Sequence, residues 1–200
     1  MNFPEFFAAV PRLITYDPLA ELLGAGDGII EYGYADAVRL AGHSCPTVAG
    51  AYLMTHKALA ALYPDGQPQR GGVRVELAAA QGDGTAGVTG SVAGLLTGAA
   101  GEGGFKGLAG KYVRRNLLQF GVPIDGELRF TRLDSGASVV TTYHPGIVPP
   151  LPEMQTLMPA VLSGTASAAE RSEFGRLWQM RVKRLLIDHF DNSALVVCQE

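Results

Sequence analysis

The stretch from Gly42 to Tyr52, Gly-His-Ser-Cys-Pro-Thr-Val-Ala-Gly-Ala-Tyr, passes from a polar turn directly into a helix. Pro46 suits a first helical position, because its ring fixes φ and its missing N–H is not needed there. Apolar residues then recur at helical spacing, at Val48, Tyr52, Leu59 and Leu62. This pattern predicts a largely buried helix from Pro46 to about Tyr63.

Two shorter helices are predicted before this segment. Asp17 can cap a helix that has Pro18 at its first position, a face made of Leu19, Leu22 and Leu23, and Gly24 at its end. Residues 36–41 are expected to form a second short helix that Gly42 closes.

Strands are predicted mainly after the Pro46 helix. Residues 73–77 alternate apolar and charged side chains, which is typical of a half-buried strand. Residues 113–120 suggest another strand, and residues 128–133 and 137–143 a hairpin across Asp134-Ser135-Gly136. The prolines and glycine of residues 144–152 indicate an irregular loop.

Residues 82–110 are extremely rich in glycine, with a helical island at residues 91–96. Gly82-x-Gly84-x-x-Gly87 matches the spacing of a dinucleotide-binding loop, but no clear βαβ unit surrounds it, and Gly110-Lys111-Tyr112 does not complete a phosphate loop. Close backbone packing explains the glycines better. The alternative is a mobile loop that covers a substrate, with Lys106 or Lys111 as an anion contact.

A strong helix closes the sequence, over about residues 167–190. Ser167 and Glu170 form a capping box, and an apolar stripe follows at Phe174, Leu177, Trp178, Val182, Leu185 and Leu186. The stripe is expected to pack on the core or on a second subunit. We therefore predict a single α+β domain over residues 1–200, with a mixed sheet packed by helices, a core over about 15–160 and a long C-terminal helix.

Composition excludes several classes of protein. The chain has 200 residues, 47% of them hydrophobic and 18% charged, with a net charge of −3, so it is neither a disordered chain nor one with a basic nucleic-acid surface. No apolar run approaches the roughly 20 residues that span a bilayer, and the first residues lack the features of a signal peptide. Two cysteines make no disulfide framework. A cytoplasmic location, without membrane or nucleic-acid partners, is expected.

His43 and Cys45 carry the most distinctive chemistry. The positive end of the helix that begins at Pro46 favours a thiolate at Cys45, which is both a nucleophile and a soft metal ligand. Imidazole is the other common ligand of zinc, and it can also take the proton of a thiol. The alternative is a buried cysteine beside a hydrogen-bonded histidine. A metal needs further ligands, of which His144 is the best candidate and Asp83 a weaker one.

The same segment resembles the signature of the FmdE-like family, which is named after a component of formylmethanofuran dehydrogenase. That signature is commonly His-Gly-His-x-Cys-Pro-Gly followed by a slim helix. Gly42, His43, Cys45 and Pro46 match it, and residues 95–111 are similar to a later Thr-Gly-Cys, glycine-rich and Gly-Lys region. The resemblance covers roughly residues 15–190. It implies a core similar to the C-terminal domain of glyceraldehyde-3-phosphate dehydrogenase, a homodimer, and a divalent metal such as zinc near the signature.

The chain departs from that signature at Ala41, Thr47 and Ala99, which replace a histidine, a glycine and a cysteine, and it has no CxxC zinc finger. We expect a metal- or thiolate-dependent small-molecule site, with His43 and Cys45, joined by His144, as metal ligands. If the site depends on a thiolate instead of a metal, we expect Cys45 to be the nucleophile, His43 the base and Lys111 an anion contact. A metal- or cofactor-binding module without enzymatic activity, or an accessory subunit of an oxidoreductase, remains open.

Overall fold

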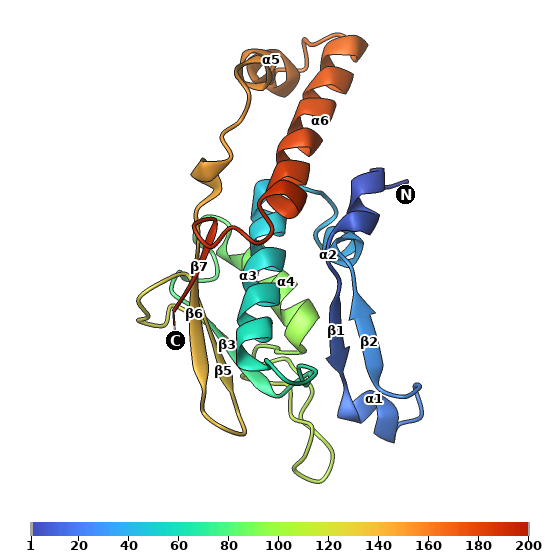
Figure 1. The fold of residues 1–200 in the computed structure, drawn as a ribbon, viewed down its shortest axis with the longest axis vertical. Coiled ribbons are helices and arrows are strands. Elements are labelled where there is room, and N and C mark those ends of the chain that lie inside the picture. Colours follow the sequence, from blue (N-terminus) through green and yellow to red (C-terminus); the bar gives the residue numbers. More distant parts are fainter. Residues whose placement is uncertain (1, 200) are drawn as a thin grey trace.

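A computed structural model describes residues 2–199 and combines helices with a mixed sheet, which confirms the predicted α+β class (Figure 1). Residues 1 and 200, the ends of the predicted domain, lie outside the described residues. The sheet has five strands in the order β4-β3-β5-β6-β7. Their bounds are β3 Val73–Leu77, β4 Leu118–Phe120, β5 Leu128–Arg132, β6 Ser138–Tyr143 and β7 Val196–Gln199.

The middle of the sheet is antiparallel. Leu77 of β3 faces Leu128 of β5, and the predicted hairpin forms from β5 and β6 with Thr131 opposite Ser138. β7 completes the sheet beside β6, with Val196 opposite Tyr143, although its four residues were not predicted as a strand. β6 and β7 are far apart in the sequence, so their pairing leaves no local signal. β7 shows no alternation of apolar and polar residues that would predict it, and it is a strand because it pairs with β6.

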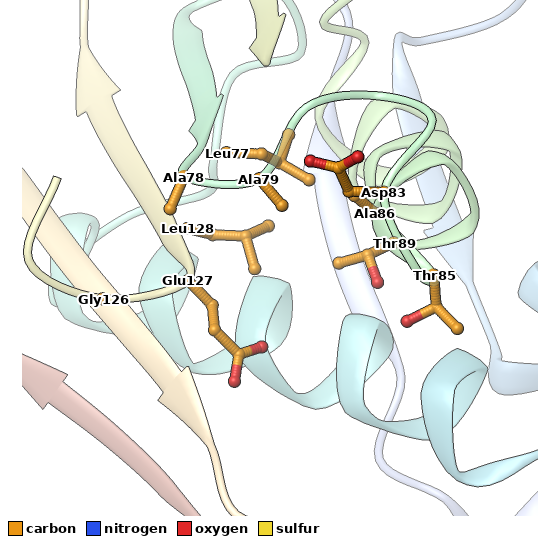
Figure 2. A pocket seen from close by; sticks show the side chains of 10 residues that line it. All are labelled: Leu77, Ala78, Ala79, Asp83, Thr85, Ala86, Thr89, Gly126, Glu127 and Leu128. Atoms are coloured by element: carbon orange, nitrogen blue, oxygen red, sulfur yellow. The ribbon is translucent and has the colours of Figure 1, made fainter. Parts of the chain in front are cut away.

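β3, α4 (Ala86–Thr97) and β4 form a βαβ unit, because β3 and β4 are parallel. The expectation that no such unit surrounds the glycine pattern was therefore wrong, and the predicted helical island is a 12-residue helix. Glycine lowers helix propensity, but here close packing requires it: a Cβ on Gly90 would lie 2.5 Å from the Phe120 ring. The turn between β3 and α4 borders a cavity (Figure 2).

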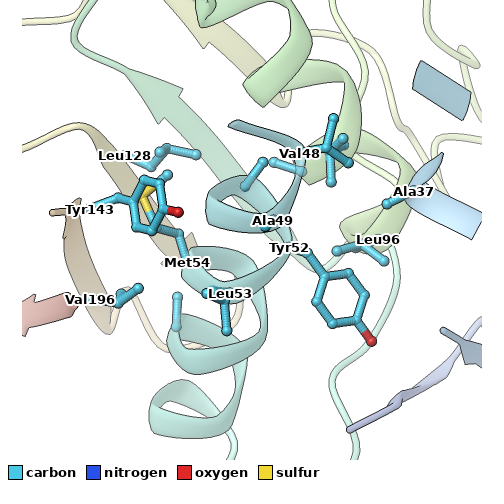
Figure 3. Close-up of a cluster of buried hydrophobic side chains, with 14 of the residues drawn as sticks. Ala37, Val48, Ala49, Tyr52, Leu53, Met54, Leu96, Leu128, Tyr143 and Val196 are labelled. Atoms are coloured by element: carbon cyan, nitrogen blue, oxygen red, sulfur yellow. The ribbon is translucent and has the colours of Figure 1, made fainter. Parts of the chain in front are cut away.

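α3 (Pro46–Leu62) is the central helix and begins at the predicted residue. It lies between the sheet and α4, so Tyr143, Leu128 and Val196 pack on one side of it and Leu96 on the other (Figure 3). The four apolar positions that predicted this helix are all buried, at Val48, Tyr52, Leu59 and Leu62.

The N-terminal part adds a two-stranded antiparallel sheet. The elements are η1 Glu5–Ala9, β1 Leu13–Tyr16, α1 Pro18–Leu22, β2 Ile29–Tyr32 and α2 Tyr34–Ala41. Asp17 caps α1 as predicted, through the amides of Leu19 and Ala20. The same carboxylate also pairs with Arg70 at 3.1 Å and Arg114 at 2.7 Å, which ties this sheet to the rest of the protein.

The C-terminal part projects from the sheet as a pair of helices, α5 (Pro152–Leu162) and α6 (Ala168–Lys183), which pack on each other (Figure 1). α6 carries the predicted Ser167–Glu170 capping box and continues into a π-helical turn, η3 (Arg184–Asp188). Residues 144–152 are mostly irregular as predicted, apart from the short η2 (Pro145–Ile147). α5 was not predicted, because the prolines around it indicate a loop while Pro152 in fact occupies its first turn.

Two further elements differ from the prediction. The strand predicted over residues 113–120 is confined to residues 118–120, because Tyr112 and Asn116 adopt positive φ angles of 60° that break extended pairing. The leucine face expected on α1 is not buried: Leu22 and Leu23 are exposed. Within residues 2–199, no helix combines the length and the apolar character needed to cross a membrane.

Candidate functional site

The predicted site lies in the turn between α2 and α3. Gly42 adopts a left-handed conformation with φ of 77° and closes α2 through a hydrogen bond from its amide to the Val38 carbonyl. Pro46 starts α3 directly afterwards, so the chain must reverse within residues 42–45. Cys45 is the N-cap of α3, and its Sγ accepts a hydrogen bond from the Val48 amide at 3.5 Å. The prediction that Cys45 stands at a helix start is confirmed.

His43 and Cys45 occupy different environments. Cys45 is 9% exposed and belongs to the hydrophobic core, whereas the His43 side chain is exposed and its Nδ1 lies 3.0 Å from the Ala41 carbonyl oxygen. A small thiol fits a buried N-cap, while a ring two residues earlier is directed to the surface of the turn. His43 and Cys45 are close in the sequence, but the structure does not bring their side chains into one cavity.

The hydrogen bond of His43 fixes its tautomer. A carbonyl oxygen can only accept, so Nδ1 carries the proton and the neutral ring has its free lone pair on Nε2. That nitrogen can accept a hydrogen bond from a ligand, or a proton from one. Among the described residues Nε2 has no hydrogen-bond partner.

Ser44 attaches the turn to α6. Its carbonyl oxygen accepts hydrogen bonds from Trp178 Nε1 at 2.9 Å and Gln179 Nε2 at 3.2 Å, and its hydroxyl donates to Gln179 Oε1 at 2.9 Å. The Tyr34 hydroxyl lies 3.0 Å from the same serine hydroxyl oxygen. Hydrogen bonds from α2 and α6 thus hold the turn in place, and they fix the backbone from which the His43 side chain projects.

An apolar groove opens beside this turn, between it and the α5–α6 pair. It has a volume of about 490 Å³. Its main lining residues are His43, Ser44, Met158, Leu162, Phe174 and Trp178. Phe174 and Trp178 pack with ring centroids 5.7 Å apart. Most of the lining is apolar, and its polar side chains Ser44 and Gln179 are hydrogen-bonded to each other.

Tyr143 is a buried group whose pKa is influenced by Cys45. Its ring packs so closely on α3 that a Cβ on Gly50 would lie 2.3 Å from it, and its hydroxyl has no hydrogen-bond partner among the described residues. Burial raises the pKa of Tyr143; Arg181 opposes this, while Cys45 and Glu127 add to it. Tyr143 therefore interacts electrostatically both with the Cys45 thiol and with Glu127, which lines the cavity of Figure 2.

The residues present do not fit a zinc ion. Residues 2–199 contain no group of three or more His, Cys, Asp or Glu side chains that could hold a metal. His144 is exposed and follows Tyr143 at the end of β6, where it acts electrostatically on Glu127 rather than joining His43 and Cys45. The structure does not assemble the predicted ligand set of His43, Cys45 and His144.

Lys111, the predicted anion contact, is exposed in the loop before β4 and lines neither the groove nor the cavity of Figure 2. Asp83 does line that cavity. Glu127, Thr89 and Gln179 were missed by sequence reasoning. None of them stands in a recognisable pattern, and only the fold places them beside other polar groups.

Comparison of the chain with protein-family models, with curated proteins and with solved structures gives no match. The resemblance to the FmdE-like family therefore stays a prediction.

Proposed function

We propose that the protein is a binding module that holds a small, largely apolar molecule in the groove between the residue 42–46 turn and α5–α6. The observation that carries this proposal is the groove itself, whose largely apolar lining includes a histidine with a free ring nitrogen. Ligand pockets commonly enclose about 300–1,000 Å³ and combine apolar walls with a few fixed polar groups. The groove has both properties.

The chemistry of the ligand follows from the lining. Phe174 and Trp178 offer aromatic surface for an apolar body. The Nε2 atom of neutral His43 accepts a hydrogen bond from a hydroxyl or carboxylic acid group, and a protonated His43 pairs with a carboxylate. A molecule with an apolar body and one hydroxyl or carboxyl end is therefore the class that this groove suits.

This proposal places the small-molecule site at the predicted Gly-His-Ser-Cys-Pro segment. It assigns the binding role to His43 rather than to the Cys45 thiol. Cys45 lies in the core behind the turn, where its sulfur caps α3. Thiolate-dependent catalysis and a role as an oxidoreductase component stay predictions.

A second copy of the chain is the rival occupant of the same groove, since a homodimer is predicted and Leu162 at the end of α5 is 79% exposed. Large exposed apolar residues are frequent at protein interfaces. We favour the small molecule, because the groove has the volume of a ligand pocket and His43 offers it a free ring nitrogen.

Trp178 makes the test direct, because it is the single tryptophan of the chain and lines the groove. We expect 1-anilinonaphthalene-8-sulfonate, an apolar aromatic anion, to bind saturably and to change Trp178 fluorescence. Phe174→Ser should weaken binding about tenfold or more, because it removes an aromatic wall. His43→Ala should weaken binding less, because only the polar end is lost.

Leu133→Ser is the matched control, since Leu133 is an exposed leucine that does not line the groove. Unchanged affinity in Phe174→Ser would remove the proposal. So would a dimer, seen by sedimentation velocity, that dissociates in Leu162→Ser while the wild-type dimer excludes the probe. That second result would assign the groove to another copy of the chain.

A further inference from the structure

The loop that joins α4 to β4 projects at the end of the molecule opposite the α5–α6 pair (Figure 1). Its central part, residues 105–112, reads Phe-Lys-Gly-Leu-Ala-Gly-Lys-Tyr. The uncharged residues 107–110 are thus flanked on each side by a lysine and then by an aromatic residue. We call residues 105–112 the tip. No residue of the tip lines the groove beside His43.

Backbone hydrogen bonds give the tip a fixed shape. The amides of Leu108 and Lys111 each donate to the carbonyl oxygen of the other residue, at 2.9 and 2.8 Å, which closes a tight turn. Within residues 2–199, the non-glycine residues with a positive φ are Ala109, Tyr112 and Asn116, all in this loop. Left-handed backbone costs free energy in such residues, so its concentration here points to a shape that serves a function.

The loop is also anchored to the rest of the protein. Arg114 is buried and pairs with Asp17 at 2.7 Å. The amides of Arg114 and Arg115 donate to the Phe105 carbonyl oxygen at 2.9 and 3.2 Å, which ties the two ends of the tip together. The side chains of the tip are therefore presented to solvent on a fixed frame.

The tip exposes large apolar side chains. Phe105 and Leu108 are each 42% exposed. α1 lies at the same end of the molecule and adds Leu22 and Leu23, which are 58% and 64% exposed (Figure 1). Large apolar side chains that gather on one exposed part of a protein mark a contact surface.

Free positive charge accompanies these apolar side chains. Lys106 and Lys111 of the tip, with Arg115 just after it, are exposed. None of the three forms an ion pair with a carboxylate of residues 2–199. Residues 101–116 contain a single acidic residue, Glu102, in a chain whose net charge is −3. A partner of this loop is therefore expected to be anionic.

We propose that the tip docks on an anionic membrane surface. Phe105 and Leu108 enter the headgroup region, and the three cations contact the negatively charged lipid headgroups. Long cationic side chains and aromatic rings are favoured at this boundary, because they combine an apolar body with a polar or charged end. Each cation near such a surface and each apolar group that enters it adds to the affinity. Nucleic acid would also attract the cations, but it gives no role to an exposed leucine at the centre of the tip.

The proposal differs from the prediction that the protein has no membrane partner. That prediction rested on the lack of an apolar run long enough to span a bilayer, whereas attachment to a membrane surface needs no spanning segment. Few side chains take part, and each contributes little. The attachment is therefore expected to be reversible and sensitive to salt.

Flotation of the purified protein with lipid vesicles tests the proposal. We expect binding to phosphatidylcholine vesicles that contain about 30% phosphatidylserine, and little binding to phosphatidylcholine alone. Raising the salt concentration from about 0.1 M to about 0.5 M should release most of the protein, because salt screens the charges. Equal binding to the two kinds of vesicle, or binding to neither, would overturn the proposal.

Paired charge variants separate the tip from the net charge of the protein. The double variant Lys106→Gln/Lys111→Gln should bind the anionic vesicles about 30-fold more weakly than wild type. The double variant Lys183→Gln/Arg184→Gln, at the end of α6, makes the same change in net charge and should bind nearly as well as wild type. Equal affinity in the two double variants would contradict the assignment to the tip.

A second pair of variants tests the apolar contact. Leu108→Ser should weaken binding about fivefold, because less apolar surface leaves water. Leu40→Ser removes an exposed leucine from α2 and should leave binding unchanged. Circular dichroism should show the same fold in both variants, since both side chains are exposed. Unchanged binding in Leu108→Ser would exclude entry of the tip into the headgroup region.

Competition identifies other anionic partners. At constant ionic strength, release of the protein from vesicles by millimolar inorganic phosphate would assign the lysines to a free phosphate. Tighter binding to a single-stranded RNA of about 20 nucleotides than to the vesicles would assign them to nucleic acid. The tip variants should still bind 1-anilinonaphthalene-8-sulfonate beside His43 as wild type does, so this proposal and the proposed groove are tested separately.

Discussion

The indole nitrogen of Trp178 donates a hydrogen bond to the carbonyl oxygen of Ser44, 134 residues earlier in the chain, over 2.9 Å. This bond joins the long C-terminal helix to the turn that carries His43 and Cys45. Gln179 adds two further hydrogen bonds to the same serine. The turn therefore owes its position to α6 as much as to α2 and α3.

Trp178→Phe should lower the free energy of unfolding by about 1–2 kcal/mol, because it removes one hydrogen bond and part of a buried side chain. Urea denaturation monitored by circular dichroism measures the change. The single variant Gln179→Ala and the double variant Trp178→Phe/Gln179→Ala complete a double-mutant cycle. Because both side chains donate to one carbonyl, the two effects should deviate from additivity by about 0.5 kcal/mol or more. Strict additivity would show that the two bonds act independently.

Asp17→Asn should destabilise the protein by about 3 kcal/mol, since it leaves Arg70 and Arg114 partly buried without a carboxylate. Burial acts to raise the pKa of Asp17. The opposing effects are larger together and hold the pKa below its usual value; they come from Arg114, the Ala20 amide, Arg70 and the Leu19 amide. The stability from this carboxylate is thus present above about pH 3.9 and is lost as pH falls through the lower folded-state pKa.

The difference in stability between wild type and Asp17→Asn should therefore be constant at neutral pH and narrow below about pH 4. Urea midpoints measured across this range test the expectation. Asp65→Asn, at an exposed residue without a hydrogen bond to its side chain in residues 2–199, is the control and should change little. A difference that widens on acidification would contradict the assignment.

Gly50→Ala and Gly175→Ala make the same change in two helices and should have opposite effects. A Cβ at Gly50 would meet the Tyr143 ring at 2.3 Å, so we expect a loss of about 1–3 kcal/mol. A Cβ at Gly175 meets nothing within 4 Å, so helix propensity should add about 0.5–1 kcal/mol. Thermal and urea unfolding measure both, and equal effects would show that Tyr143 moves freely.

Alkylation tests the accessibility of the two thiols. In native protein, iodoacetamide should modify Cys198 first, because Cys198 is exposed and Cys45 is buried. Burial still raises the pKa of the Cys198 thiol, so its reaction should be slower than that of an unfolded cysteine. In denaturant both residues should react alike. Mass spectrometry of the labelled peptides gives the two rates, and faster native labelling of Cys45 would revive the thiolate-dependent site.

Local chemistry made several elements predictable. Pro46 at the start of α3, Asp17 at the start of α1 and the Ser167–Glu170 capping box each satisfy helix ends through neighbours in the sequence. The alternation of residues 73–77 likewise identified β3, whose apolar face is buried, although Glu76 on the other face is buried as well. In these cases the interactions that form the element lie within a few residues of it.

Elements that depend on distant partners were missed or predicted too short. Only residues 91–96 of α4 were predicted as helical, because glycine disfavours helix; the full helix forms since its small residues allow close contact with Phe120 and α3. β7 and α5 lack a pattern of their own and are held by β6 and α6. Their stabilising contacts cannot be read from spacing in the chain.

The sequence by itself determined the α+β class, the helix that begins at Pro46 and the turn that presents His43, since backbone geometry and capping act over short distances. Tertiary structure alone decided that the Cys45 thiol enters the core while the His43 ring stays at the surface. It also decided that Glu127 and Thr89, neither of them part of a pattern, face one cavity. Burial is a property of the packed molecule, so the surroundings of a side chain depend on elements far away in the sequence.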